Sequence, residues 1–178
     1  DLYLIHWPAN AAWHDDWKEL NLDTWRALEE LYRSKRARAI GFSNFLAHHV
    51  QAILDGCEIA PMVDQVEYHP GFGQRETAAF CQAHGIAVQA WSPLGRAEIL
   101  GNDTIEAIAR AHGKTPAQVC LRWCLQKGLA PLPKSTRPER MQENLKVFDF
   151  ELTPQDMASI DALPSCGGMH FDPDTAQS

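Results

Sequence analysis

The chain has 178 residues, of which 45% are hydrophobic and 22% are charged, so it is long enough to bury the core of a globular domain. No apolar run approaches the roughly 18–20 residues of a membrane-spanning helix, and the first residues lack the basic region and cleavage pattern of a signal peptide. A net charge of −7 at pH 7 disfavours a nucleic-acid partner.

The cysteine content favours a reducing compartment. The five cysteines form no CxxC pair, and their number is odd. We therefore expect reduced core thiols in a cytoplasmic protein, with a regulatory thiol as the alternative. They are Cys57, Cys81, Cys120, Cys124 and Cys166.

Short apolar stretches alternate with amphipathic stretches along the whole chain. In chain order, the predicted strands lie near residues 2–5, 37–42, 62–66, 86–90 and 129–132, the last weakened by two prolines. Apolar residues at helical spacing predict helices within residues 22–32, 46–54 and 77–84. The tail from residue 165 to 178, rich in Gly, Asp and Pro, is predicted to be irregular.

Two later helices have clear start signals, and glycines mark three helix ends. Thr115 and Thr153 each precede a proline and suit the N-cap position. Gly85, Gly113 and Gly128 each follow an apolar helical stretch, as is typical of helix ends.

Regular alternation of strand and helix predicts an α/β fold with a parallel sheet, either open or closed into a barrel. No GxGxxG follows any strand, so the usual dinucleotide fingerprint is absent. Polar residues stand at the end of every predicted strand, where a (β/α)8 barrel carries its active site, and this favours the barrel. They are His6 with Trp7, Ser43 with Asn44, Gln65, Trp91 with Ser92, and Lys134 with Ser135.

Five segments resemble motifs of the aldo-keto reductase family. They read DLYLIHWP at residues 1–8, RAIGFSNF at 38–45, QVEYHP at 65–70, WSPLG at 91–95 and LPKS at 132–135. The resemblance runs in order from residue 1 to about 165. It implies a TIM-type barrel of which residues 1–178 form the C-terminal portion, from the fourth strand to the eighth, as part of a single domain.

The resemblance implies a role for each polar strand end of the first half. His6 would orient the substrate carbonyl, and Trp7 would contribute to substrate binding. The nicotinamide carboxamide offers both a donor and an acceptor, and Ser43, Asn44 and Gln65 would form hydrogen bonds with it.

The remaining cofactor contacts are implied for the second half. Trp91 would stack under the nicotinamide ring, in place of the tyrosine that many members use. Ser92 to Gly95 would wrap the pyrophosphate, with Leu94 and Gly95 allowing close approach of the backbone.

The adenosine end of the cofactor would meet the segment that follows the last predicted strand. The resemblance implies that Lys134, Ser135 and Arg140 hold a 2′-phosphate, while Glu143 and Asn144 meet the adenine. The local charge agrees, because Lys134, Arg137 and Arg140 form a basic cluster in an acidic chain. Guanidinium groups bind phosphate through two N–H groups, so NADP(H) is favoured over NAD.

Members of the family donate a proton from a tyrosine whose pKa is lowered by a lysine that an aspartate orients. In the resemblance these three residues precede the strand that opens this chain. None of Tyr3, Tyr32 and Tyr68 occupies the donor's place. We therefore interpret the sequence as a partial enzyme whose exposed sheet edges would make the fragment self-associate.

Each assignment has a structural alternative. His6 alone could be an ordinary polar residue at a strand end, and Ser43-Asn44 could be a turn or helix cap. Trp91 could belong to the core, and the basic cluster could be an exposed helix start. Residues 13–17 could line a substrate pocket or form a mobile surface loop.

A metal site is not expected. His48-His49 and His69 invite one, but adjacent histidines on a helix should point in different directions, and no HExxH or paired carboxylate accompanies them.

The sequence thus predicts NADPH-dependent reduction of a small aldehyde or ketone, with no membrane or nucleic-acid partner. Two alternatives stay open. One is a non-catalytic nicotinamide-binding barrel module, and the other is a barrel isomerase or aldolase whose phosphorylated sugar is held by Lys134 and Arg140.

Overall fold

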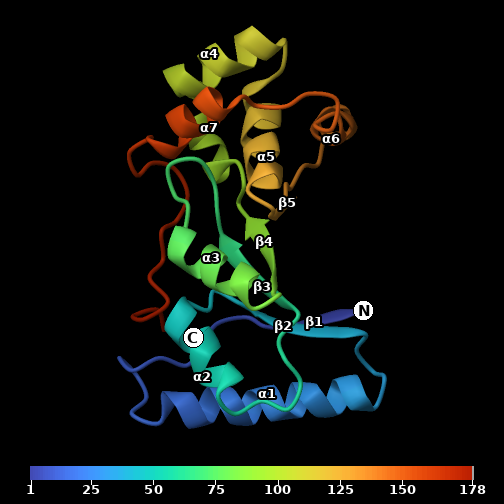
Figure 1. The fold of residues 1–178 in the computed structure, drawn as a ribbon, viewed down its shortest axis with the longest axis vertical. Coiled ribbons are helices and arrows are strands. Elements are labelled where there is room, and N and C mark those ends of the chain that lie inside the picture. The colour runs from blue at the N-terminus through green and yellow to red at the C-terminus, as the bar shows by residue number, and fades with distance from the viewer. Residues whose placement is uncertain (178) are drawn as a thin grey trace. The chain divides into compact units, whose positions relative to one another are not determined.

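A computed structural model describes residues 1–177 and divides them into two compact units. The first unit contains residues 1–66, 75–88 and the chain from Phe171 onward. The second contains residues 67–74 and 89–170. Figure 1 labels the elements of both units along the chain.

The first unit is built on three parallel strands in chain order, β1 (Leu2–Ile5), β2 (Ala39–Ser43) and β3 (Val63–Glu67). The helices of this unit are α1 (Trp17–Arg33), α2 (Ala47–Leu54) and α3 (Arg75–Ala83). α1 contacts both α2 and β2, and its buried Trp25 meets Phe42 of β2 with the ring centroids 5.8 Å apart. An apolar core therefore lies between α1 and this sheet.

The second unit carries the parallel pair of β4 (Ala87–Trp91), which begins in the first unit, and β5 (Ala130–Leu132). Between them lie a 3-10 segment (Gly95–Gly101), α4 (Asp103–His112) and α5 (Pro116–Gln126). Two further helices follow, α6 (Pro138–Leu145) and α7 (Pro154–Asp161). α4 contacts α5 and α7, and α5 contacts α6 (Figure 1).

The predicted helix starts and ends are confirmed. The Thr115 hydroxyl accepts the Gln118 N–H at 3.3 Å, and the Thr153 hydroxyl accepts the Asp156 N–H at 3.1 Å. Gly113, Gly85 and Gly128 all have positive φ, which glycine adopts without the steric penalty of a Cβ atom.

β1 pairs with β2, β2 with β3, and β4 with β5, all in parallel, as the α/β prediction requires. Four of the five strands differ by one or two residues from their predicted bounds, because pairing rather than local pattern sets where a strand begins and ends. Gln65 is consequently the third residue of β3 and not its end, although it stands opposite Ser43, the last residue of β2.

The last strand has only three residues. Pro131 lies within it, opposite Ala90 of β4, so the weak sequence signal corresponds to a short strand. None of the helices among residues 1–177 has the length and apolarity needed to cross a bilayer.

Candidate functional site

The first unit brings together the three predicted nicotinamide residues at the end of β2 and in the middle of β3. The Ser43 hydroxyl donates to the Gln65 carbonyl at 2.5 Å, and the backbone N–H of Asn44 donates to the same oxygen at 3.0 Å. The Asn44 side-chain amide donates to the His6 carbonyl at 2.9 Å. These bonds join β1, β2 and β3 at one end and hold Ser43 and Asn44 in buried positions.

Ser43 and Asn44 do not cap a helix. α2 starts after Leu46, whose N–H donates to the His49 Nδ1 at 3.2 Å. Asn44 instead has a positive φ of 62°, a conformation that asparagine tolerates better than most residues. The helix-cap alternative for this pair is therefore wrong.

His6 and Trp7 follow β1 directly. The His6 side chain is exposed, and its ring centroid lies 6.2 Å from that of half-buried Trp7. Trp7 in turn meets Phe171 edge to face at 6.2 Å. The two residues therefore stand side by side on an accessible part of the first unit.

The second unit contains a cavity of about 840 Å³ that collects most of the residues predicted to bind the pyrophosphate, 2′-phosphate and adenine. Trp91 and Gly95 are not among its lining residues. The predicted residues that line the cavity are Ser92, Leu94, Lys134, Ser135, Arg140, Glu143 and Asn144.

The cavity carries three cationic side chains. They are Lys134 and Arg140, which the sequence analysis assigned to a phosphate, and Arg96, which it did not single out. Among residues 1–177, neither Lys134 nor Arg140 is paired with an acidic side chain, so both keep their charge available for an anion. Arg137, the third member of the predicted basic cluster, does not line the cavity.

Glu143 is the one acidic side chain in the lining. Its carboxylate accepts the Thr115 hydroxyl at 2.7 Å, and its carbonyl accepts the Gln118 side-chain amide at 3.0 Å. Glu143 therefore ties α6, which also carries Arg140, to the start of α5.

The loop at residues 92–97, which lines the same cavity, has an unusual backbone. Ser92, Gly95, Arg96 and Ala97 have φ values of 52°, 50°, 56° and 72°. Three of these four residues are not glycine, and left-handed conformations of such residues cost free energy that the surrounding structure must offset. Such strain is common at ligand-binding sites, so the 92–97 loop is a feature of functional interest.

The positions of Trp91 and the tyrosines are also defined. Trp91 is half-buried as the last residue of β4, and its carbonyl accepts the Tyr68 N–H at 3.3 Å. Tyr3 lies within β1 and Tyr32 on α1. Tyr68 is buried and stacks on Trp123 with the centroids 5.1 Å apart.

The cysteines are unpaired thiols, as expected for a reduced protein. Three are buried in the core as predicted, namely Cys81, Cys120 and Cys124, whereas Cys57 and Cys166 are only half-buried. Burial raises the pKa of Cys120 to about 12, and it also raises the pKa of Cys81 and Cys124. Thiols in such surroundings are poor nucleophiles.

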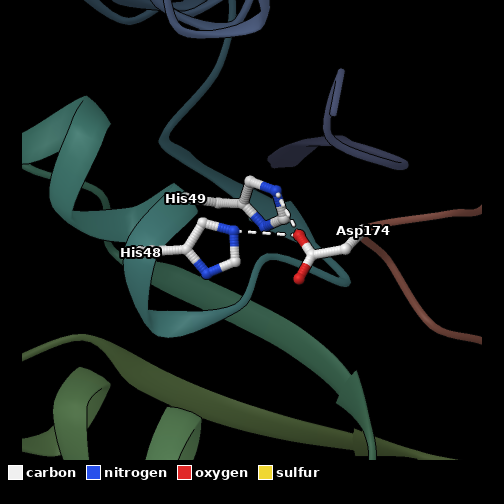
Figure 2. A group of neighbouring side chains, drawn as sticks. All are labelled: His48, His49 and Asp174. Atoms are coloured by element: carbon white, nitrogen blue, oxygen red, sulfur yellow. Dashed lines mark ion pairs between the residues drawn. The ribbon is translucent and has the colours of Figure 1, made fainter. Parts of the chain in front are cut away.

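One prediction about the histidines is wrong. His48 and His49 do not diverge: their ring centroids lie 4.0 Å apart, and both Nε2 atoms approach one Asp174 oxygen, at 2.9 and 3.2 Å (Figure 2). The two rings converge because both point to the same carboxylate oxygen of Asp174 in the C-terminal segment.

The tautomer of His49 argues against a metal ligand at this cluster. Its Nδ1 accepts the Leu46 N–H, so the proton of the neutral ring is on Nε2 and points to Asp174. Burial, with a smaller effect of His48, lowers the pKa of His49 to about 3, so the ring is neutral at pH 7. Metal binding through Nε2 would cost the bond to Leu46, whereas the observed contacts fit a hydrogen-bonded cluster.

Comparison with known proteins identifies the family of this chain. Residues 1–164 match the profile of the aldo/keto reductase family. The chain is 49% identical over 177 residues to 9,11-endoperoxide prostaglandin H2 reductase of Trypanosoma cruzi, and 50% identical over 163 residues to glyoxal reductase of Bacillus subtilis. These alignments cover 98% and 92% of the chain, but only 60% and 56% of the relatives.

Solved structures share the fold. Apo Gox0644 superposes with a TM-score of 0.90 at 43% identity, covering 100% of the chain and 64% of Gox0644. A Gox0644 variant in complex with NADPH gives 0.89 at 44% identity, with the same two coverages. The predicted α/β fold, with strands and helices of a (β/α)8 barrel, is thereby confirmed.

Proposed function

Because this chain belongs to the aldo/keto reductase family, we propose that the protein reduces an aldehyde or ketone to an alcohol with NADPH. The observation that carries the proposal is the cavity of the second unit, with its cationic side chains. Its volume of about 840 Å³ lies within the usual range of small-molecule sites, roughly 300–1,000 Å³.

The cavity suits a ligand that carries a pyrophosphate and a separate phosphate. Lys134 and Arg140 stand on the segment after β5 and on α6, where we assign them to the 2′-phosphate together with Ser135. Arg96 and the backbone from Ser92 to Gly95 are assigned to the pyrophosphate. Bonds from guanidinium to phosphate are roughly twice as strong as neutral hydrogen bonds, so these contacts would account for most of the affinity.

The adenine is assigned to Glu143 and Asn144, which line the cavity beside Arg140. A carboxylate and a carboxamide suit the donors and acceptors of the adenine edge. Trp91 is assigned to the nicotinamide ring, and Gly95 to close approach of the loop backbone.

In the first unit we assign Ser43, Asn44 and Gln65 to the nicotinamide carboxamide. His6, which is exposed, is assigned to the substrate carbonyl and Trp7 to the substrate's body. When bound, NADPH supplies the hydride that the carbonyl carbon accepts. His6 would donate a hydrogen bond to the carbonyl oxygen, stabilising the negative charge that develops there.

The proton that completes the alcohol comes, in the family resemblance, from a tyrosine. None of Tyr3, Tyr32 and Tyr68 is assigned this role, since they lie within β1, on α1 and in the core. The substrate class is a small aldehyde or dicarbonyl, which the glyoxal reductase relative supports.

The test compares alanine variants of two neighbouring arginines in the protein as it occurs naturally. Arg140→Ala should weaken NADPH binding by about 1.5–3 kcal/mol, or about 10- to 150-fold, and NADH binding much less, because only NADPH has the 2′-phosphate. Arg137→Ala is the matched control, since Arg137 is also exposed but does not line the cavity. Quenching of tryptophan fluorescence during titration measures both affinities.

A second variant separates the reaction itself from the binding of the cofactor. His6→Ala should leave the NADPH affinity unchanged and slow NADPH oxidation by a carbonyl substrate about 10²–10³-fold. Equal losses for both cofactors in Arg140→Ala, or no NADPH binding by the wild type, would contradict the proposal. Binding of a phosphorylated sugar without NADPH would favour an isomerase or aldolase instead.

A further inference from the structure

A buried carboxylate of the second unit is engaged by backbone groups far away in the sequence. Glu67, the last residue of β3, is almost fully buried. Its Oε1 accepts the Met169 N–H at 2.7 Å, and its Oε2 accepts the His170 N–H at 2.8 Å. Both oxygens therefore hold the backbone of a segment about 100 residues downstream.

The charge of Glu67 is retained in the fold. Burial raises the pKa of its carboxyl group, but His69 and the two amide N–H groups outweigh burial, and the pKa falls below its ordinary 4.5. His69 is fully buried, with its Nδ1 2.9 Å from the Pro70 carbonyl and its Nε2 3.5 Å from Glu67 Oε1. Because a carbonyl only accepts, Nδ1 carries a proton.

Glycine is required where the downstream segment crosses this pair. Gly168 has a φ of +82°, and a Cβ atom added there would lie 2.3 Å from Glu67 Oε1 and 2.3 Å from His69 Nε2. No side chain fits at such distances. The backbone of residues 167–170 therefore lies directly against the carboxylate and the imidazole.

The same segment holds the 92–97 loop. The Gly168 N–H donates to the Gly95 carbonyl at 3.2 Å. Gly95 also lies close to His69, since an added Cβ would lie 3.3 Å from Nδ1. Glu67 holds the backbone of Met169 and His170, and so also positions the neighbouring Gly168. Gly168 in turn holds Gly95, where the loop backbone becomes left-handed.

We propose that Glu67 is a positioning residue for cofactor binding, which holds the 92–97 loop in its binding conformation through the backbone of residues 167–170. The inference rests on the proposed function, because it assigns the loop to a phosphorylated cofactor. The left-handed backbone at Arg96 and Ala97 needs such external support, since it is unfavourable for these residues in isolation.

The test uses two variants of the protein as it occurs naturally. Glu67→Gln keeps the shape of the side chain but turns an amide NH₂ toward one of the two N–H groups, so one bond is lost. Gly168→Ala keeps the carboxylate and removes the room for the segment. Each should raise the Kd for NADPH about tenfold or more, while turnover at saturating NADPH changes little.

Matched controls distinguish positioning from general stability. Glu29 is a buried carboxylate of the first unit that also accepts two backbone N–H groups, from Glu58 at 2.7 Å and Ile59 at 2.8 Å. Glu29→Gln should lower stability without changing the Kd for NADPH. Gly113→Ala has a similar positive φ of 61° but meets no atom within 4 Å, so it controls for backbone strain.

A second readout does not depend on the cofactor. Without NADPH, amide hydrogen exchange across residues 92–101 should be faster in Glu67→Gln than in the wild type, and unchanged in Glu29→Gln. Unchanged exchange, or unchanged NADPH affinity in both test variants, would overturn the inference. If the wild type fails to bind NADPH while the exchange result holds, the proposed function fails and the support of the loop by Glu67 stands.

Discussion

Asp64 carries its carboxyl group in the middle of β3, where it is fully buried. Its Oδ2 accepts the Cys81 thiol at 3.6 Å, and its Oδ1 has no hydrogen-bond partner within residues 1–177. Burial raises the pKa of Asp64 well above the ordinary 3.8, although bonds from Cys81 and the Phe45 backbone lower it. Burial therefore favours the neutral form of this carboxyl group.

This burial predicts an unusual dependence of stability on pH. A carboxyl group whose pKa is raised by folding binds its proton more tightly in the folded state. The free energy of unfolding should therefore fall as pH rises above the ordinary carboxyl pKa, by at most about 1.4 kcal/mol per pH unit. Asp64→Asn should remove this contribution, as measured by urea unfolding between pH 5 and pH 8.

Exposed Asp23, which pairs with exposed Arg26, provides the control. Asp23→Asn should leave the slope of stability against pH close to that of the wild type. If Asp64→Asn and the wild type have the same slope, the carboxyl group is already ionised in the folded protein.

At the scale of elements, the helix starts were predictable because they depend on neighbouring residues alone. Thr115 and Thr153 each form a capping box with the residue three positions on. The end of β3 was not predictable to the residue, because β3 continues for two residues beyond Gln65, its last residue paired with β2. Local patterns thus identify an element more reliably than its last residue.

The residues of the site also differ in how far local sequence patterns could identify them. The residues assigned individually from the family resemblance include seven of the sixteen residues that line the cavity, because these seven fall in two short stretches of the sequence. Arg96 was missed because it follows the motif and carries no pattern of its own. The contacts of Glu67 with Met169 and His170 were also missed, since only the folded chain brings these residues together.

The two capped helices give a prediction at this scale. The Thr115 hydroxyl caps α5 and also donates to Glu143 of α6, whereas Thr153 is exposed and bonds only within its own helix start. Thr153→Ala should cost about 1 kcal/mol of unfolding free energy, and Thr115→Ala about 2–3 kcal/mol. Equal losses in thermal or urea unfolding would show that the bond to Glu143 contributes nothing to stability.

At the scale of the molecule, apolar side chains remain exposed in each unit. In the first unit they include Leu2 and Tyr3 of β1. In the second, Leu145 and Phe148 are each 72% exposed and line an apolar hollow of about 420 Å³. Within residues 1–177, β1 pairs with β2 and β5 with β4, each on one side only. Open strand edges beside apolar surface recruit other chains.

Residues 1–178 produced alone should therefore self-associate. Replacing Leu145 and Phe148 together by lysine should reduce this association, because each exposed large apolar side chain that stays in water forgoes roughly 1.5–3 kcal/mol. Exposed Gln142→Lys, which adds charge without removing apolar surface, is the control. Sedimentation velocity measures the outcome, and a wild-type chain that stays monomeric at all concentrations would contradict the prediction.

The left-handed backbone at Arg96 and Ala97 has a consequence for engineering the protein toward heat resistance. Ala97, with a φ of 72°, is a position where glycine would relieve strain of roughly 1–3 kcal/mol. Selection for thermal stability alone would therefore favour Ala97→Gly. Glycine would also let the loop sample many more conformations, so the gain in melting temperature should come with weaker binding of the proposed cofactor, a trade-off located at a single residue.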